Sequence, residues 1–368
     1  MLAASCEREA PAATPSKPAR SPSTAAATEP PIPQPDELLV AYLYDREVDA
    51  LDAASTAPYQ AAQLAFEAAS SEASPAAVEL AAIDVSDRSA DEISATIRED
   101  EAYVAAVVAP RVIDQAAIVD ALDVPVVSLS SRDRVASEPG AWRRLVPTTE
   151  QLGMTAGAWA VALGGDDVCV VPSPSDGSRF ATAAARAVRD AGGDVLSIGG
   201  GDAGVDQCGA IVWTTGYEDA VVTLHALGRP RPSFIGGPEL RAPDFLETAG
   251  AAANGVGAVC ACADVSTSLR LADQRFVQVF QAEHGAPPGP GAVEAWDAAN
   301  LLVDAIAAAG PSRDALATSV ASRTRFDGLG GTYVFAPNGE LEDPADHTFR
   351  YRVEGGRWVD VTPRRSAR

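Results

Sequence analysis

The sequence predicts an α/β protein built from two lobes, each a doubly wound parallel sheet with helices on both faces. Short strand-like runs that are almost continuously apolar alternate with helical stretches, which is typical of parallel sheets covered on both sides. This series ends near Leu129 and begins again near Val168, so the pattern occurs twice. The length of 368 residues also exceeds that of one ordinary domain and accommodates two.

The first series covers the chain from Leu38 to Leu129. Apolar runs are predicted as strands, and the stretches between them as helices. In chain order the elements are strand 38–42, helix 59–69, strand 78–85, helix 90–99, strand 104–108, helix 114–122 and strand 124–129. Strands that are separated by helices predict parallel pairing, because a helical crossover returns the chain to the sheet in the same direction.

The second series begins at Val168 and ends in extra helices and a hairpin. Its elements are strand 168–171, helix 179–191, strands 195–198 and 210–213, helix 217–227, and strands 233–235 and 256–260. Three helices follow at 269–283, 292–309 and 314–322, and segments 332–335 and 349–353 are expected to pair as a closing hairpin around Asn338-Gly339. Two similar α/β halves imply a cleft, where such proteins usually hold ligands.

The charge of the chain argues against one class of function. Lysine and arginine total 28 against 51 aspartate and glutamate, and the net charge of -23 repels phosphate backbones. No basic stripe with interleaved aromatic residues offsets this field, so nucleic-acid binding is not expected. Solubility or a salty habitat explains the acidity, with a cationic ligand as the alternative. No apolar run of about 18 residues is present that could span a bilayer.

The N-terminal residues predict a lipid anchor and a tether. Leu2-Ala3-Ala4-Ser5 precedes Cys6 and resembles the end of a bacterial lipoprotein signal, whose cysteine accepts the lipid. Only five residues precede Cys6, so segment 1–6 is expected to be a truncated signal; a chance run of small residues is the alternative. Segment 7–36 holds eight prolines and almost no large apolar residue, which predicts a disordered tether. Fully extended, such a tether reaches up to roughly 90 Å.

The other cysteines are Cys169, Cys208, Cys260 and Cys262. They lack the paired CxxC spacing and the neighbouring histidines of a zinc site, so no metal is expected. Cys169 and Cys260 lie in strand-like runs, where a cysteine is usually a small buried apolar side chain. An oxidising compartment would permit a disulfide among the four, but the spacing does not determine which cysteines pair.

One motif suggests a nucleotide-binding enzyme. Residues 199–204 fit G-x-G-x-x-G directly after an apolar strand. The fingerprint requires a helix next, whereas 210–213 reads as another strand, so a surface turn is preferred and no cofactor is expected. His225, His284 and His347 are scattered and are expected to be ordinary surface or helix-end residues. The sequence has no HExxH, G-x-S-x-G or Walker motif, so no catalytic residue is assigned and the chain is not expected to be an enzyme.

Several short stretches in a fixed order carry a family resemblance. They are 108–110 with 115–117, 125–128, 144–147, 185–188 with 191–192, 234–239, 245–250, 285–289 and 326–331. In this order and spacing, residues 37–361 resemble the Leu/Ile/Val-binding proteins, a branched-chain amino-acid group of type 1 periplasmic binding proteins. The resemblance implies two doubly wound lobes joined by three crossings, near Pro147, Asp264 and Gly330. Lobe 1 would then hold 37–147 and 265–329, lobe 2 would hold 148–264 and 330–362, and 363–368 would be a tail.

The resemblance also implies ligand-binding residues. Ser130 and Ser131 match a turn whose amides and hydroxyl hold a ligand carboxylate, an arrangement of several donors converging on an anion. Phe180 matches an aromatic side chain that covers the ligand, and Tyr217 matches an aromatic residue in a Gly-Tyr turn. Glu239 matches the acid that receives a ligand ammonium group. For each residue, a role in packing or on the surface is the alternative.

Other positions depart from the family pattern. Thr149 stands where amino-acid binders carry an aspartate, so half of the charge that pairs with an ammonium group is absent. Arg111 replaces a ligand-binding serine, and Arg132 lies near a ligand-binding threonine. An arginine can bind a carboxylate through two hydrogen bonds, so both could favour a more acidic ligand; surface charges are the alternative. The loop 46–57 lacks the glycine-rich form of the family, and leucine or valine is therefore a doubtful ligand.

The resemblance implies a solute-binding lipoprotein that delivers a small polar or amino-acid-like molecule to an ABC permease. Such a protein is exported to the periplasm or the cell surface, is held by a lipid anchor only, and closes its lobes over the ligand without covalent chemistry. A sensor or receptor domain of the same fold is the first alternative. An enzyme on an α/β scaffold and a protein-binding surface derived from the cleft are weaker alternatives, because fold similarity alone does not determine function.

Overall fold

The computed structural model describes most of the chain beyond residue 36. The described residues are 37–49, 55–71, 77–112, 115–132, 141–172, 177–197, 204, 207–228 and 230–363. Cys6 and the signal end, the tether 7–36, residues 199–203 of the glycine motif and residues 364–368 of the tail lie outside them. The expectations for these segments therefore stay predictions.

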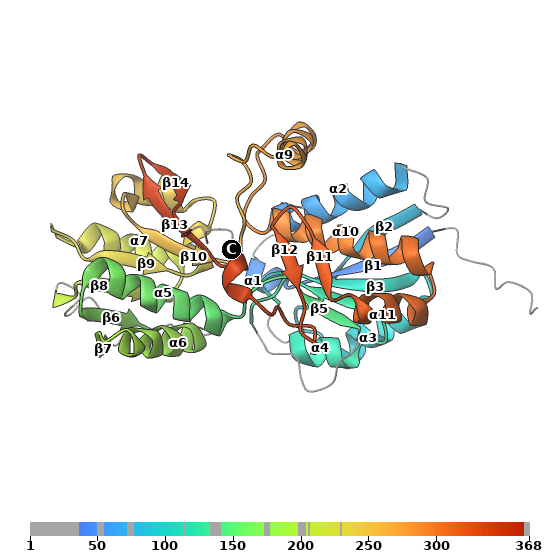
Figure 1. Ribbon diagram of the computed structural model, residues 1–368, viewed down its shortest axis with the longest axis horizontal. Coiled ribbons are helices and arrows are strands. Elements are labelled where there is room, and N and C mark those ends of the chain that lie inside the picture. Colours follow the sequence, from blue (N-terminus) through green and yellow to red (C-terminus); the bar gives the residue numbers. More distant parts are fainter. Residues whose placement is uncertain are drawn as a thin grey trace, which may run out of the picture. The chain divides into compact units, whose positions relative to one another are not determined.

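The first half of the chain forms a five-stranded parallel sheet with the order β2-β1-β3-β4-β5 (Figure 1). Its strands are β1 (Glu37–Tyr44), β2 (Ala77–Asp84), β3 (Tyr103–Val108), β4 (Val126–Ser128) and β5 (Trp142–Arg144). The helices between them are α1 (Arg46–Asp49), α2 (Ala57–Ser71), α3 (Ala90–Glu99) and α4 (Gln115–Ala121). The first four strands match predicted strands. The sequence does not predict β5, because Trp-Arg-Arg contains no apolar run.

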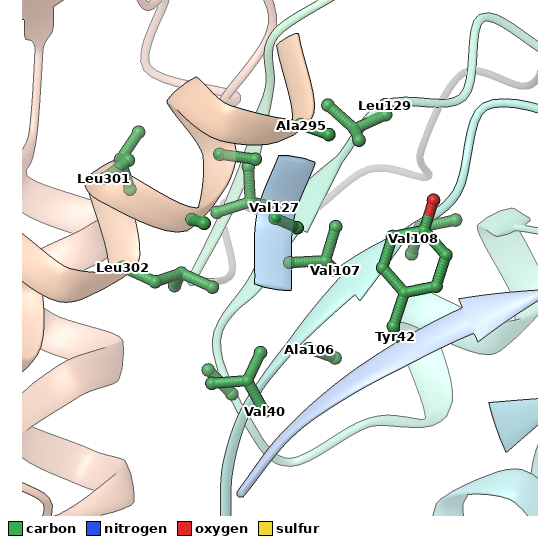
Figure 2. Packing of buried hydrophobic residues seen from close by; sticks show 14 of the residues in the cluster. Val40, Tyr42, Ala106, Val107, Val108, Val127, Leu129, Ala295, Leu301 and Leu302 are labelled. Atoms are coloured by element: carbon green, nitrogen blue, oxygen red, sulfur yellow. The ribbon is translucent and has the colours of Figure 1, made fainter. Parts of the chain in front are cut away.

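Three later helices complete the core of this first sheet. They are α9 (Leu271–His284), α10 (Ala292–Ala309) and α11 (Arg313–Ser322). Figure 2 shows Leu301 and Leu302 of α10 in the same packed cluster as Val107 and Val127 of the sheet. A strand such as β3, buried along nearly its whole length, needs cover on both faces, and helix α10 supplies part of that cover. The chain thus returns to the first core after it has built the second sheet.

The second sheet has seven strands in the order β14-β13-β10-β9-β8-β6-β7. They are β6 (Asp167–Val171), β7 (Asp194–Ser197), β8 (Ala210–Trp213), β9 (Ser233–Gly236), β10 (Gly257–Cys260), β13 (Phe349–Glu354) and β14 (Arg357–Asp360). Strands β6 to β10 pair in parallel, while β13 and β14 are antiparallel. The helical elements of this half are α5 (Thr149–Gly164), α6 (Gly177–Asp190), α7 (Tyr217–Ala226), η3 (Pro238–Arg241), α8 (Phe245–Ala249) and η4 (Gly250–Ala253).

Helix α5 is not among the predicted elements, although the sequence carries a signal for it. Thr148 accepts a hydrogen bond from the backbone N–H of Gln151, and the Gln151 side chain accepts one from the Thr148 backbone. This reciprocal pair is a capping box, which marks the start of a helix. Gly153 and Gly157 on α5 then face the backbone of α6 so closely that a Cβ atom at either would overlap it. The two helices therefore pack at a distance that only glycine permits.

The predicted hairpin between 332–335 and 349–353 is wrong. Strand β12 (Thr332–Val334) pairs with β11 (Arg325–Asp327), and β13 pairs with β10 and β14 instead. The Asn338-Gly339 turn does form, with Gly339 at a φ of 82°, but it closes only a single bridge between Phe335 and Leu341. The sequence locates the turn, while the choice of partner strand depends on which sheet has a free edge.

Core membership shows where the chain passes between the two halves. Leu145 belongs to the core of the first sheet and Leu152 to a core of the second, so the first passage (146–151) includes the predicted crossing at Pro147. The second passage (263–264) lies between Cys262 and Val265, at the predicted Asp264. The third passage (342–348) follows Leu341 of the first core and precedes β13, so it lies later than the predicted Gly330. The exact lobe boundaries stay predictions.

Two disulfides answer the question that the spacing left open. Cys169 of β6 is bonded to Cys208, and Cys260 is bonded to Cys262 at the end of β10. Among the described residues, no group of three or more His, Cys, Asp or Glu side chains could hold a metal ion. No helix in the described part of the chain is long and apolar enough to cross a membrane.

Candidate ligand-binding site

The predicted site residues lie beyond the carboxyl ends of parallel strands, which is where open α/β sheets bind ligands. In the first sheet, Arg111 follows β3, and Ser130, Ser131 and Arg132 follow the neighbouring strand β4. In the second sheet, predicted residues follow β6, β8 and β9, three strands that are adjacent in the order β9-β8-β6. The topology therefore gathers these residues at the carboxyl ends of the strands, which form the binding edge of each sheet.

Ser130 organises the turn after β4. Its side chain is fully buried, and its hydroxyl donates to the carbonyl of Val112 at 3.2 Å and accepts from the backbone N–H of Arg132 at 3.3 Å. Its own N–H donates to Ser128 Oγ at 3.1 Å. The hydroxyl is thus already committed to the protein, and its contribution to a ligand site is to fix the shape of the turn.

Ser131 and Thr149 connect this turn to the start of α5. The carbonyl of Ser131 accepts from the backbone N–H of Thr149 at 2.6 Å and from its hydroxyl at 3.0 Å. Thr149 therefore links the binding edge of the first sheet to the first passage. Its neutral hydroxyl donates to Ser131 and supplies no charge for a ligand.

Arg144 supports the same turn from the end of β5, and it is not among the predicted site residues. The side chain is completely buried at the end of β5, where it donates to the carbonyl of Ser130. Its Nε lies 2.9 Å from Glu340 Oε2, so the cation is paired. The two predicted arginines are less buried, since Arg111 is exposed and Arg132 is half-buried. The arginine-rich sequence Trp-Arg-Arg is the signal, because a buried strand rarely contains charge without a specific partner.

A cavity of about 300 Å³ lies at the carboxyl ends of β1 and β2. Its polar lining includes Asp45, Glu47, Ser86, Asp87 and Arg88, all of which the sequence analysis misses. The signal for them is that Ser86, Asp87 and Arg88 follow the predicted strand 78–85 directly, and Asp45 and Glu47 come within five residues of the end of strand 38–42, at the binding edge.

Ser86 holds the acidic part of this cavity together. Its hydroxyl lies 2.7 Å from Asp84 Oδ1 and 3.2 Å from Asp45 Oδ1. Burial opposes ionisation of Asp84, but the hydrogen bonds from Ser86 and Arg46 and the charge of Arg46 outweigh it and keep the pKa of this carboxyl below its usual value. Asp84 lies behind the lining, which itself carries the carboxyl groups of Asp45, Glu47 and Asp87 beside the guanidinium of Arg88.

Phe180 and Glu239 converge on Gly237 in the second sheet. Phe180 follows β6 and is buried, while Glu239 follows β9 and is exposed. A Cβ atom at Gly237 would lie 2.5 Å from Glu239 Oε2 and 3.4 Å from Phe180 Cε2. The edge of an aromatic ring and a carboxylate thus meet at this buried glycine, where any larger residue would displace them.

Tyr217 lies at the end of the strand between them. It opens α7 after β8, is half-buried, and packs against a different core cluster from Phe180. The Gly-Tyr turn is fixed by the indole N–H of Trp213, which donates to the carbonyl of Gly216 at 3.4 Å. The neighbouring Glu218 carboxylate raises the pKa of the Tyr217 phenol, so Tyr217 stays a neutral hydrogen-bonding group.

Comparison with known proteins supports this assignment of the fold. The family model for periplasmic binding proteins, a non-enzymatic family, matches residues 201–352. No curated protein matches the sequence. The structure is similar to a leucine-binding protein from Thermotoga maritima, with a TM-score of 0.72 and 18% identity over 88% of this chain and 97% of that one.

Two further structures have different ligands. An ABC transporter substrate-binding protein from Desulfitobacterium hafniense in complex with Leu gives a TM-score of 0.72 at 17% identity, covering 88% of this chain and all 100% of that one. A solute-binding protein of an ABC transporter from R. palustris in complex with benzoate gives 0.66 at 17% identity, covering 89% and 96%. The predicted fold class is confirmed, and at these identities the ligand does not transfer with the fold.

Proposed function

The chain has the fold of type 1 periplasmic binding proteins and matches their family model over residues 201–352, and from this premise we propose that it is an extracytoplasmic solute-binding protein of an ABC importer. The observation that carries the proposal is the placement of Phe180, Tyr217 and Glu239 after three adjacent parallel strands of the second sheet. In our proposal, this binding edge and that of the first sheet form the two parts of one site, whose halves meet around a solute.

The proposed ligand is a small polar or amino-acid-like molecule. Glu239 is suited to an ammonium group, and Phe180 and Tyr217 are suited to cover the body of the ligand. Arg111 and Arg132 follow adjacent strands and are suited to a carboxylate. Because Thr149 brings no charge, the balance of these groups favours a ligand with more negative charge than a neutral aliphatic amino acid.

The cellular setting is part of the same proposal. A lipid on Cys6 and a proline-rich tether would hold the binding protein at the outer face of a membrane, where it meets an ABC permease. The two disulfides are consistent with an oxidising compartment, because such bonds are rare in reducing ones. A ligand-sensing receptor domain would use the same fold and site, and identification of the protein that binds the closed form separates the two.

The test begins with the molecules that the protein retains. Small molecules released from purified protein are identified by mass spectrometry, and amino acids, amides and dicarboxylates are screened by thermal shift. A ligand at a hundred times its Kd stabilises the folded state by about 2.7 kcal/mol, which is a shift that is easily measured. Dicarboxylates and acidic amino acids are expected to give the largest shifts.

Matched variants assign the shift to the proposed site. Glu239→Ala and Tyr217→Ala are expected to abolish it. Glu247→Ala removes an equally exposed carboxylate from α8 and is expected to preserve it. If both site variants kept the full shift, the assignment of the site would be wrong.

A further inference from the structure

Helix α10 carries two buried carboxyl groups that the proposed ligand site does not use. Glu294 and Asp297 are three residues apart, on one face of the helix, and are only 3% and 1% exposed. A buried carboxyl group is costly unless it is hydrogen-bonded, so its partners show what it is for. Glu294 binds the second passage itself, whereas Asp297 binds residues 329–333, which belong to the first half and precede the third passage in the chain.

Asp297 binds the segment before β12. One oxygen accepts from the backbone N–H of Leu329 at 2.7 Å, and the other accepts from Gly330 at 2.8 Å and from the hydroxyl of Tyr333 at 2.8 Å. A Cβ atom at Gly328 would overlap the carboxylate, so glycine is required for this close approach. Asp297 therefore holds this loop by three donors at once.

Tyr333 extends the contact to the third passage. Its ring stacks on His347 with the centroids 4.3 Å apart and the planes at 10°. His347 is buried, and its Nε2 lies 3.1 Å from the carbonyl of Thr332. His347 is the last residue of the 3-10 helix Pro344–His347, as the helix-end expectation allows, but it is buried and not at the surface, and it anchors the third passage to the core that α10 builds.

Glu294 binds the second passage directly. Its Oε1 accepts from the backbone N–H of Ala263 at 2.7 Å. Its other oxygen is buried and has no hydrogen-bond partner among the described residues. A cavity of about 660 Å³ borders Ala263, Leu329 and Gly330, so a small movement of the second passage or of the loop at Leu329-Gly330 could bring water to these groups.

From this geometry we infer that Glu294 and Asp297 are positioning residues of the hinge: Glu294 ties the second passage to α10 directly, Asp297 holds the third passage through Tyr333 and His347, and the two together set how readily the two halves move. The inference rests on the proposed function, because relative movement of the halves is what captures a ligand. Helix α10 is fixed in the first core by Leu301, Leu302 and their neighbours. The second passage is short, so the bond from its Ala263 amide to Glu294 restricts the backbone rotation that a hinge needs.

The charge state of the two groups is sensitive near neutral pH. Burial raises the pKa of Glu294 to about 8. Burial also raises the pKa of Asp297, to about 6, while the amides of Gly330 and Leu329 limit the rise. Several charged or titratable groups on other elements lie near the pair. Arg270, which precedes α9, forms an ion pair with Asp273 on that helix. The others are Tyr333 on β12, His347 in the third passage and Tyr351 on β13. Rising pH thus favours any rearrangement that hydrates the newly formed carboxylate.

The test measures hydrogen exchange and solution shape without any ligand. Peptides that cover Ala263 and Leu329-Gly330 are followed by mass spectrometry between pH 5.5 and 9, with rates corrected for intrinsic exchange. In the unmodified protein, corrected exchange at Ala263 is expected to rise through about pH 8, together with the radius of gyration from small-angle scattering. Glu294→Gln keeps an acceptor oxygen but cannot ionise, so it is expected to remove this pH step.

The other variants separate positioning from general stability. Asp297→Asn replaces one acceptor by a donor and is expected to speed exchange at Leu329-Gly330 by roughly tenfold or more. Should that variant fail to fold, Tyr333→Phe removes a single donor and is expected to give a smaller increase at the same peptide. Glu283→Gln, an exposed change on α9, is expected to have no effect. A pH step that persists in Glu294→Gln, or unchanged exchange in the variants of Asp297 and Tyr333, would overturn the inference, and neither result depends on a ligand being found.

Discussion

Replacing Glu294 by glutamine should remove a pH dependence of the free energy of unfolding. The carboxyl is buried, and its pKa rises from 4.5 to about 8 in the folded protein. Between these values the folded protein binds a proton that the unfolded chain does not, so stability is highest at low pH and falls as pH rises. Between about pH 6.5 and pH 8 the loss amounts to about 1.5 kcal/mol for this one group.

Other titratable groups contribute little to the change in stability between pH 6.5 and pH 8. Asp297 titrates at about pH 6, so most of its contribution is lost before the window begins. Burial lowers the pKa of His347, so its effect has the opposite sign and lies mostly below its usual value of 6.5, with about 0.4 kcal/mol left inside the window. The cysteines of the two disulfides do not titrate. A slope measured between pH 6.5 and pH 8 therefore reports mainly on Glu294.

The assay is urea denaturation followed by tryptophan fluorescence at a series of pH values, with linear extrapolation to water. The unmodified protein is expected to lose about 1.5 kcal/mol across the window, and Glu294→Gln is expected to show a flat profile. Glu283→Gln serves as the control, because it removes the same charge from an exposed position and should keep the slope. A flat profile in the unmodified protein, or equal slopes in all three, would refute the reasoning about burial.

Three further substitutions test contacts within one or the other half, the ion pair of Arg144 in the first and the two disulfides in the second. Arg144→Met leaves the carboxylate of Glu340 without its buried partner and is expected to cost roughly 3 kcal/mol in urea denaturation; no loss would show that the ion pair contributes nothing. Cys208→Ser opens the bridge to Cys169, which spans 39 residues, and by loop entropy should cost about 4 kcal/mol. Cys262→Ser opens a bridge that spans only 2 residues, so its loss should be several times smaller, and equal losses would contradict the entropic account.

The candidate site could be predicted only in outline. Tyr217 and Glu239 follow predicted strands, and the rule that ligands bind at carboxyl ends places both at the binding edge. Ser130 shows the limit of this reasoning. Its residue type and position suit a hydrogen-bond donor to a ligand, but its hydroxyl donates to the carbonyl of Val112. Whether a polar group is available depends on neighbours that are distant in the sequence.

The sequence by itself determined the α/β class, the repeated sheet and most elements, because these follow from local periodicity. The bounds of α3 and α10 agree with the prediction at both ends, since each is marked by a strong apolar pattern. Only the tertiary structure decided the partner of β12, the pairing of the cysteines and the burial of Glu294, Asp297 and His347. Each of these depends on which surfaces meet when distant segments pack, and a local pattern holds no information about that meeting.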